Sequence, residues 1–163
     1  MNCLIIYMSR HGTTEKVVKL LQEKLGETNC QLHNLEAGKM PELSNFDTLL
    51  IGGSIHVGQI QKEVKSFCGK HEKLLLQKKL GLFICFMEKE KGQMEFEMAF
   101  PEILRKHAVA HGLFGGELLF DKMNFIERTI IRKIKKVNAS VSEIDFDAIE
   151  KFAASILSSS KTA

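Results

Sequence analysis

The chain has 163 residues, of which 44% are hydrophobic and 26% are charged, and its 23 Lys and Arg against 20 Asp and Glu give a net charge of +3. This length and composition fit one folded domain, which we expect to span residues 1–163, and exclude the disordered, collagen-like and disulfide-stapled classes. The charge is too small for a dedicated nucleic-acid binder, and no run approaches the roughly 18 apolar residues of a membrane-spanning helix.

Five short apolar runs alternate along the chain with segments of helical periodicity. The runs predict strands at 3–8, 31–35, 48–51, 80–86 and 111–118. Apolar residues spaced three and four apart predict helices over 17–25, 61–76, 93–107, 122–137 and 145–157, with Pro101 as a break in the third. This alternation indicates an α/β fold with a parallel sheet covered on both faces. In such sheets, ligands bind beyond the carboxyl ends of the strands.

The turn after the first strand has the chemistry of an anion site. It reads Ser9-Arg10-His11-Gly12-Thr13-Thr14 and leads directly into a helix. A helix start offers free N–H groups and partial positive charge, and a glycine lets the backbone approach a ligand closely. The hydroxyl groups of Ser9, Thr13 and Thr14 are further donors. The sequence therefore predicts a phosphate loop, and the alternative is an ordinary helix start with Thr13 or Thr14 as the N-cap.

This turn is similar to motifs of two families. Its hydroxyl-rich form resembles the phosphate loop of the flavodoxin family. Arg10-His11-Gly12-Thr13-Thr14 also resembles a motif of the histidine phosphatase family, and Val109-Ala110-His111-Gly112 resembles a later element of that family. The phosphatase alternative implies His11 as the phosphoryl-accepting nucleophile and His111 as its partner. Against it, the chain has no arginine between residues 11 and 104 to neutralise a phosphate.

The segment after the third strand carries a more specific resemblance. Gly52, Ser54, Ile55 and Gly58 match the G-x-S-I-x-x-G pattern of a flavodoxin subgroup that has protoporphyrinogen-oxidising members. That subgroup also inserts an amphipathic helix before the last helix, and the segment from Asn124 to Lys135 resembles this insert. The chain thus resembles the flavodoxin family over nearly its whole length. The resemblance implies a flavodoxin-like three-layer sandwich with a five-stranded parallel sheet in the order 2-1-3-4-5.

The resemblance also implies a noncovalently bound FMN. Its phosphate is expected at residues 9–14, which include Arg10 and His11, and its ring between two later segments. One segment supplies Ser54, Ile55, His56, Val57 and Gly58, and the other supplies Phe86, Met87 and Glu88. The chain has no Trp and only one Tyr, Tyr7 in the first strand. The candidates for the walls around the ring are therefore His56, Val57, Phe86 and Met87.

These features predict an FMN oxidoreductase that passes electrons to a quinone or another redox partner, or a simple flavodoxin-type electron carrier. The flavin carries the chemistry, so no separate catalytic residue and no metal site are expected. The predicted helix 122–137 is basic and amphipathic. Its apolar face has three candidate roles, which are packing on the domain, peripheral contact with an anionic membrane, and formation of a homodimer.

The cysteines and the N-terminal residues bear on the compartment. Cys3, Cys30, Cys68 and Cys85 have no paired spacing. The first residues have neither the basic start nor the long apolar run of a signal peptide. We therefore expect buried free thiols in a cytoplasmic protein.

Overall fold

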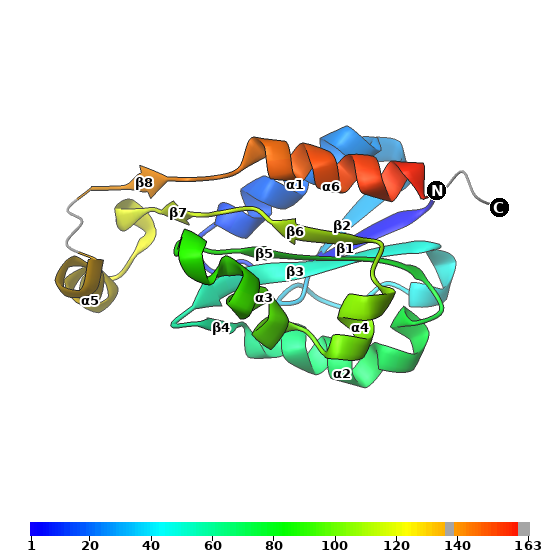
Figure 1. The fold of residues 1–163 in the computed structure, drawn as a ribbon, viewed down its shortest axis with the longest axis horizontal. Coiled ribbons are helices and arrows are strands. Elements are labelled where there is room, and N and C mark those ends of the chain that lie inside the picture. Colours follow the sequence, from blue (N-terminus) through cyan, green and yellow to red (C-terminus); the bar gives the residue numbers. More distant parts are fainter. Residues whose placement is uncertain (136–138, 160–163) are drawn as a thin grey trace.

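The computed structural model describes residues 1–135 and 139–159 and has a parallel sheet at its centre (Figure 1). The strand order is β2-β1-β3-β5-β6, and every pairing along this path is parallel. These strands are β1 Cys3–Tyr7, β2 Cys30–Asn34, β3 Thr48–His56, β5 Lys79–Cys85 and β6 Ala110–Leu113. The short β4, Gln59–Ile60, pairs antiparallel with the end of β3. Counted over the parallel strands, the order is the predicted 2-1-3-4-5.

Helices cover both faces of the sheet and complete the three layers (Figure 1). On one face lie α1 Thr13–Leu25 and α6 Phe146–Ser158, and on the other lie α2 Lys62–Leu75, α3 Gly92–Ala99 and α4 Glu102–His107. The predicted helix 93–107 is divided into α3 and α4 because Pro101 becomes the N-cap of α4. Single 3₁₀ turns stand at η1 Glu27–Asn29, η2 Leu43–Asn45, η3 Lys89–Lys91 and η4 Phe120–Lys122.

The strands separate two apolar cores because alternate side chains point to opposite faces of the sheet. In β1, Leu4 and Ile6 pack into the core under α2, and Ile5 and Tyr7 pack into the core under α1 and α6. Each of these side chains is nearly or fully buried. This explains the unbroken apolar run in the sequence, which is typical of a parallel strand covered on both sides. The four cysteines are free and buried, as predicted.

The chain makes an excursion between the last parallel strand and the last helix. The predicted strand 111–118 is two strands, β6 and β7 Glu117–Leu118, separated by Gly115 with φ 64°. After β7 come η4 and the inserted helix α5, Phe125–Lys135, and β8 Val141–Ser142 then returns beside β7. The predicted helix 122–137 thus begins three residues late, and its residues 136 and 137 lie outside the described ranges.

Helix α5 stands beyond the carboxyl edge of the sheet, at one end of the molecule (Figure 1). Phe125 and Ile126 are 82% and 69% exposed. The hypothesis that the apolar face of this helix packs on the domain is therefore wrong for these two residues. Over the ranges that the model describes, no helix combines the length and the apolar character needed to cross a membrane.

Candidate functional site

A cavity of about 310 Å³ opens where β1, β3 and β5 end. At this point the strand order reverses, because the chain goes from β1 to one side of the sheet and from β3 to the other. Open α/β sheets bind ligands at this position, and the volume is within the range of small-molecule sites. The predicted residues that line the cavity are Ser9, Arg10, His11, Thr13, Ser54, Ile55, His56, Val57, Gly58, Phe86, Met87 and Glu88. Gly12 and Thr14 were also predicted, but they are not part of the cavity wall.

The loop after β1 is organised by the hydroxyl group of Ser9. Ser9 Oγ accepts hydrogen bonds from the backbone N–H of Gly12 (3.2 Å) and of Glu15 (3.3 Å). Gly12, with φ 92°, is the N-cap of α1, and Thr13 and Thr14 lie inside its first turn. The alternative prediction of Thr13 or Thr14 as the N-cap is therefore wrong. The positive φ of Gly12 is a conformation that other residues rarely adopt, which explains the glycine.

Thr14 has unused hydrogen-bonding capacity in this loop. Its side chain is completely buried, and Thr14 Oγ1 has no nitrogen or oxygen hydrogen-bond partner among the described residues. The hydroxyl lies near the thiol of Cys85, and burial raises the pKa of that thiol to about 12 while a weak hydrogen bond with Thr14 lowers it. The backbone N–H groups of Thr13 and Thr14 also donate to no described residue. A buried hydroxyl without a partner costs free energy, so the start of α1 is suited to receive an acceptor.

The predicted end of the third strand at residue 51 is wrong, because most of the motif 52–58 belongs to the strand. Strand β3 continues to His56, and the chain turns back into β4 through Val57 and Gly58 alone. Both turn residues have positive φ, 50° at Val57 and 72° at Gly58, as in a type I′ turn. The glycines concealed the strand in the sequence, but β3 pairs with β5 as far as Ser54. The segment is therefore a hairpin that projects beside the cavity.

A hydrogen-bond network fixes the cavity side of this hairpin. Gln61 Nε2 donates to Ser54 Oγ (2.7 Å), Gln61 Oε1 accepts from the Ser54 backbone N–H (3.0 Å), and Ser54 Oγ lies 3.0 Å from His56 Nε2. A Cβ atom at Gly53 would collide with the Gln61 side chain. Burial lowers the pKa of His56, and electrostatic interactions with His11 and Arg10 lower it further, while Glu127 acts in the opposite direction. His56 is therefore neutral at pH 7.

The loop after β1 also contacts the inserted helix α5. The rings of His11 and His56 lie edge to face with their centroids 5.7 Å apart. His11 Nε2 lies 3.8 Å from the carboxylate oxygen Oε1 of Glu127 in α5. His111, in contrast, lies on β6, where its Nε2 is 2.8 Å from the Arg105 carbonyl oxygen, and it does not line the cavity. The structure thus does not bring together the two histidines that the phosphatase alternative requires.

Part of the cavity wall comes from residues that the sequence analysis missed. They are Cys85, Glu95, Gly116, Glu117, Leu118, Met123, Glu127, Ile130 and Ile131. The apolar stripe of the predicted helix was a signal for Ile130 and Ile131. The position of Glu95, a buried carboxyl group in α3, depends on how α3 packs and has no local signal.

Glu117 is also held by residues distant in the sequence. Lys16 Nζ (2.7 Å) and Ser142 Oγ (2.8 Å) donate to its carboxylate, and its side chain is 6% exposed. Burial tends to raise the pKa of Glu117, but the hydrogen bonds from Lys16 and Ser142 lower it below its usual value. Glu117 is therefore an anion in the folded protein, and its position follows from the pairing of β7 with β8.

The sheet order, the loop at the start of α1 and the cavity at the switch point define an α/β protein of the doubly wound, nucleotide-cofactor-binding class. A family model described as "Flavodoxin domain" matches residues 4–145, and the chain belongs to this family. Among curated proteins, it is 22% identical to protoporphyrinogen IX dehydrogenase [quinone] from Leishmania major, over 93% of this chain and 72% of the relative.

Solved structures confirm the fold. A short-chain flavodoxin associated with a bacterial microcompartment is similar over 99% of this chain and 100% of its own, with a TM-score of 0.58 at 13% identity. Flavodoxin from Fusobacterium nucleatum, solved with bound flavin mononucleotide, covers 99% of this chain and 98% of its own with a TM-score of 0.50 at 17% identity. The chain spans only 38% of rubredoxin oxygen:oxidoreductase from Desulfovibrio gigas, with a TM-score of 0.51 at 15% identity.

Proposed function

We propose that the chain binds FMN in the cavity at the switch point and transfers electrons through it. This proposal rests on the start of α1, which lies beside the cavity. There the buried Thr14 hydroxyl and the backbone N–H groups of Thr13 and Thr14 can donate hydrogen bonds to a ligand. A phosphate dianion supplies such acceptor oxygens, and the positive end of the α1 dipole favours its charge. Family membership and the FMN-bound flavodoxin neighbour support the same ligand.

The residues around the cavity fit the remainder of that cofactor. FMN, when bound, supplies the redox chemistry. The hairpin of Ser54 to Gly58 and the loop at Met87 flank the opening on two sides, and Met123 and Ile130 of the insert add apolar surface. The neutral His56 presents an uncharged polar edge toward the same space. Together these residues orient a flat ring and limit the access of water to it.

A visible-absorption titration tests the proposal directly. The protein, isolated with or without added FMN, is expected to show a bound-flavin spectrum and to quench flavin fluorescence in a saturable way. The Thr14→Val variant is expected to bind FMN about tenfold more weakly, because a hydrogen bond to a charged oxygen is lost. Its stability without FMN should change little, because the buried hydroxyl loses only its weak contact with the Cys85 thiol.

Thr48→Val is the matched control. Thr48 is also buried, but its Oγ1 donates to Asp47 Oδ1 (2.7 Å) at the start of β3, far from the cavity. This variant is expected to lose about 1 kcal/mol of stability and to keep its FMN affinity. Absence of any flavin binding by the wild-type protein would refute the proposal.

The L. major relative favours a second, more specific function. We propose protoporphyrinogen oxidation with a quinone as the electron acceptor, because that relative is named for this reaction. The alternative is a carrier that only exchanges electrons with a redox partner. The two are distinguished by mixing the FMN-loaded protein with protoporphyrinogen and a soluble quinone and recording porphyrin fluorescence. Porphyrin formed no faster than without protein would exclude the oxidase and leave the carrier.

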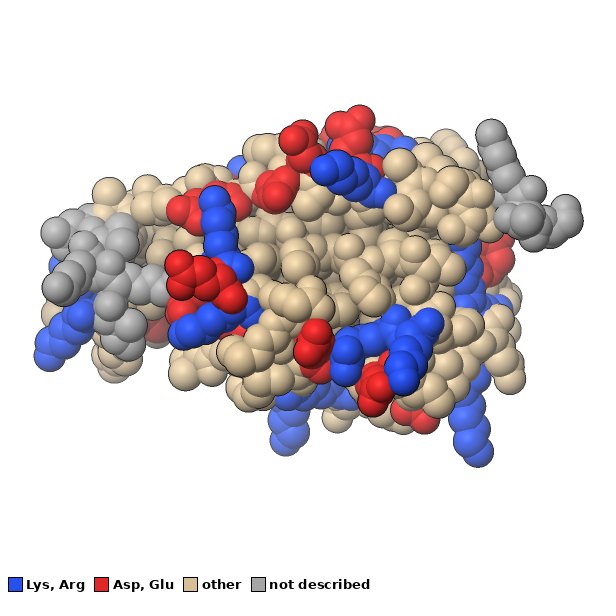
Figure 2. Space-filling view, in the orientation of Figure 1, with Lys and Arg blue, Asp and Glu red and all other residues tan. Residues whose placement is uncertain are grey.

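The exposed face of α5 favours peripheral contact with an anionic membrane. Phe125 and Ile126 extend from the helix into solvent, and Arg128, Arg132 and Lys133 lie on the same element. Blue side chains are visible at the end of the molecule where α5 lies, and others stand beside red ones elsewhere on this face (Figure 2). Exposed apolar residues together with basic ones are typical of helices that lie on anionic lipid surfaces. Two copies facing each other through α5 would instead oppose like charges.

Vesicle sedimentation tests this contact. The protein is expected to sediment with vesicles that contain phosphatidylserine and to remain in solution with purely zwitterionic vesicles. Phe125→Ser/Ile126→Ser should abolish the sedimentation, and Met94→Ser/Met98→Ser, which changes two exposed residues of α3, should not. A concentration-dependent dimer that the α5 double variant disrupts would favour self-association instead.

A further inference from the structure

The insert places a lysine against the loop at the start of α1. Lys122 is the last residue of η4, far from that loop in the sequence. A Cβ atom at Gly12 would lie only 2.8 Å from Lys122 Nζ, so the ammonium group rests on the Gly12 backbone. This contact has no local signal in the sequence, because it connects two segments about 110 residues apart and the loop itself contains no lysine.

The charges around this lysine are already largely paired with one another. Lys16 Nζ lies 2.7 Å from Glu117 Oε1, and Lys19 Nζ lies 2.9 Å from Glu15 Oε1. Glu15, Lys16 and Lys19 line, together with Glu23, the hollow on the outer side of α1 that contains Gly12 and Lys122. Lys122, in contrast, forms no ion pair within the described residues. It acts on Glu117 only at longer range, where its charge helps to lower the pKa of that carboxyl group.

We propose that Lys122 supplies a positive charge to the phosphate of the bound flavin nucleotide, and so makes the insert part of the phosphate site. This inference rests on the function proposed above. The start of α1 offers Thr14 Oγ1 and the N–H groups of Thr13 and Thr14, which are neutral donors. The Ser9 hydroxyl is already occupied by the N–H groups of Gly12 and Glu15. An ammonium group at Gly12 adds a second positive charge to that of Arg10 in the same loop, and its attraction acts on a dianion bound there.

The proposal predicts selectivity for the phosphorylated cofactor. Riboflavin has the same ring as FMN but no phosphate. Lys122 should therefore increase affinity for FMN and leave riboflavin affinity unchanged. Because Lys122 stands at the base of the insert, FMN should also order residues 120–133 more than riboflavin does.

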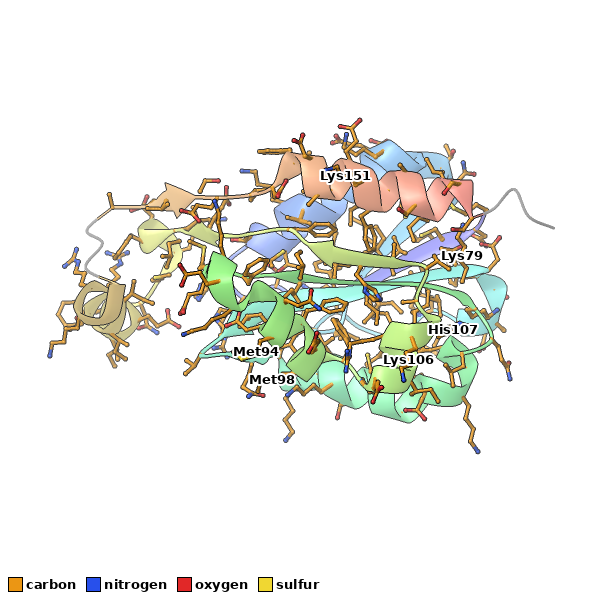
Figure 3. All side chains as sticks on the ribbon, in the orientation of Figure 1. Lys79, Met94, Met98, Lys106, His107 and Lys151 are labelled. Carbon is orange, nitrogen blue, oxygen red and sulfur yellow. The ribbon has the colours of Figure 1, made fainter. Side chains whose placement is uncertain are left out.

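The test is a pair of fluorescence titrations with FMN and with riboflavin. Lys122→Gln is expected to weaken FMN binding about twofold to fivefold at low salt, the range for an exposed charge contact, and to leave riboflavin binding unchanged. The FMN affinity of the wild type should fall with added salt more steeply than that of the variant. Lys122→Arg should retain most of the FMN affinity. Lys106→Gln is the matched control, because Lys106 is an exposed lysine on α4, well away from α5 (Figure 3).

The possible failures are distinguishable. A wild-type protein that binds neither flavin overturns the proposed function and this inference with it. If the wild type binds FMN and the Lys122→Gln variant keeps the same ratio of FMN affinity to riboflavin affinity, only the role of Lys122 is overturned. Equal weakening of both flavins in the variant also overturns it, because a phosphate contact cannot affect riboflavin. Thermal melting of each variant without flavin shows whether it folds, and hydrogen exchange over residues 120–133 provides a readout independent of affinity.

Discussion

The hairpin tip beside the cavity holds a valine in a conformation that a valine resists. Val57 has φ 50°, and within residues 1–135 and 139–159 no other non-glycine residue has a positive φ. Left-handed backbone costs an L-residue about 1–2 kcal/mol, and most for β-branched side chains. The side chain is 102% exposed, so it has no buried contact to lose. Asn is the preferred residue at this position of a type I′ turn, particularly before glycine. Val57→Asn is therefore expected to raise the free energy of unfolding by about 1 kcal/mol.

Urea denaturation of the flavin-free protein measures this gain, and thermal melting should rise by about 2–4 °C for a chain of this size. Val109→Asn is the matched control, since Val109 is 43% exposed and does not have positive φ. That variant should show little or no gain. A Val57→Asn protein no more stable than the wild type would show that the turn is not strained. If Val57 forms one wall of the flavin site, the same variant should bind FMN more weakly while it folds more stably.

Three further predictions concern other parts of the domain. Burial raises the pKa of Cys68 and of Cys85 to about 12, so a thiol reagent at about pH 8 should label neither in the native protein and both in urea, as mass spectrometry would show. Burial lowers the pKa of His56 from 6.5 in the folded protein. As the pH falls, His56 is therefore protonated in the unfolded state before it is protonated in the folded state, and the folded protein loses stability below about pH 6.5. His56→Gln should therefore lose less stability than the wild type between about pH 7.5 and pH 5.5 in urea titrations. Asp145→Ala removes the cap of α6, where Asp145 Oδ1 accepts from the Ala148 N–H (2.9 Å), and should cost about 1 kcal/mol in denaturant midpoints, while Asp147→Ala should cost less.

Much of the fold was predictable because its strands are buried on both faces. The runs at β1 and β5 are continuous and apolar, and the helices between them keep a clear period of three to four residues. The break at Pro101 follows from the missing N–H of proline. The prediction of strand ends from apolar runs was wrong where glycines interrupt a strand. Gly52 and Gly53 made the end of β3 look like a loop, although they are required there because Phe83 and Gln61 occupy the space of their side chains.

The residues of the candidate site were also predictable only in part. The segments next to the ends of β1, β3 and β5 were identified because each follows a strand directly, and all of their residues except Gly12 and Thr14 line the cavity. Glu117, Glu127 and Lys122 were missed because their positions depend on the pairing of β7 with β8 and on the direction in which η4 leaves it. These are tertiary relations between segments that the linear pattern does not connect. The assignment of FMN to these residues remains a prediction until the titrations are made.

The ribbon of β7 and β8 has a consequence for the evolution of this family. Glu117 pairs with Ser142 and Leu118 with Val141, so the chain leaves and re-enters the domain at adjacent points. The entropic cost of closing a loop rises only slowly with its length. Segments of different length and chemistry can therefore be exchanged between these two strands without shifting the register of the parallel sheet. The surface chemistry of this segment can therefore change while the cavity at the switch point keeps the strands that build it.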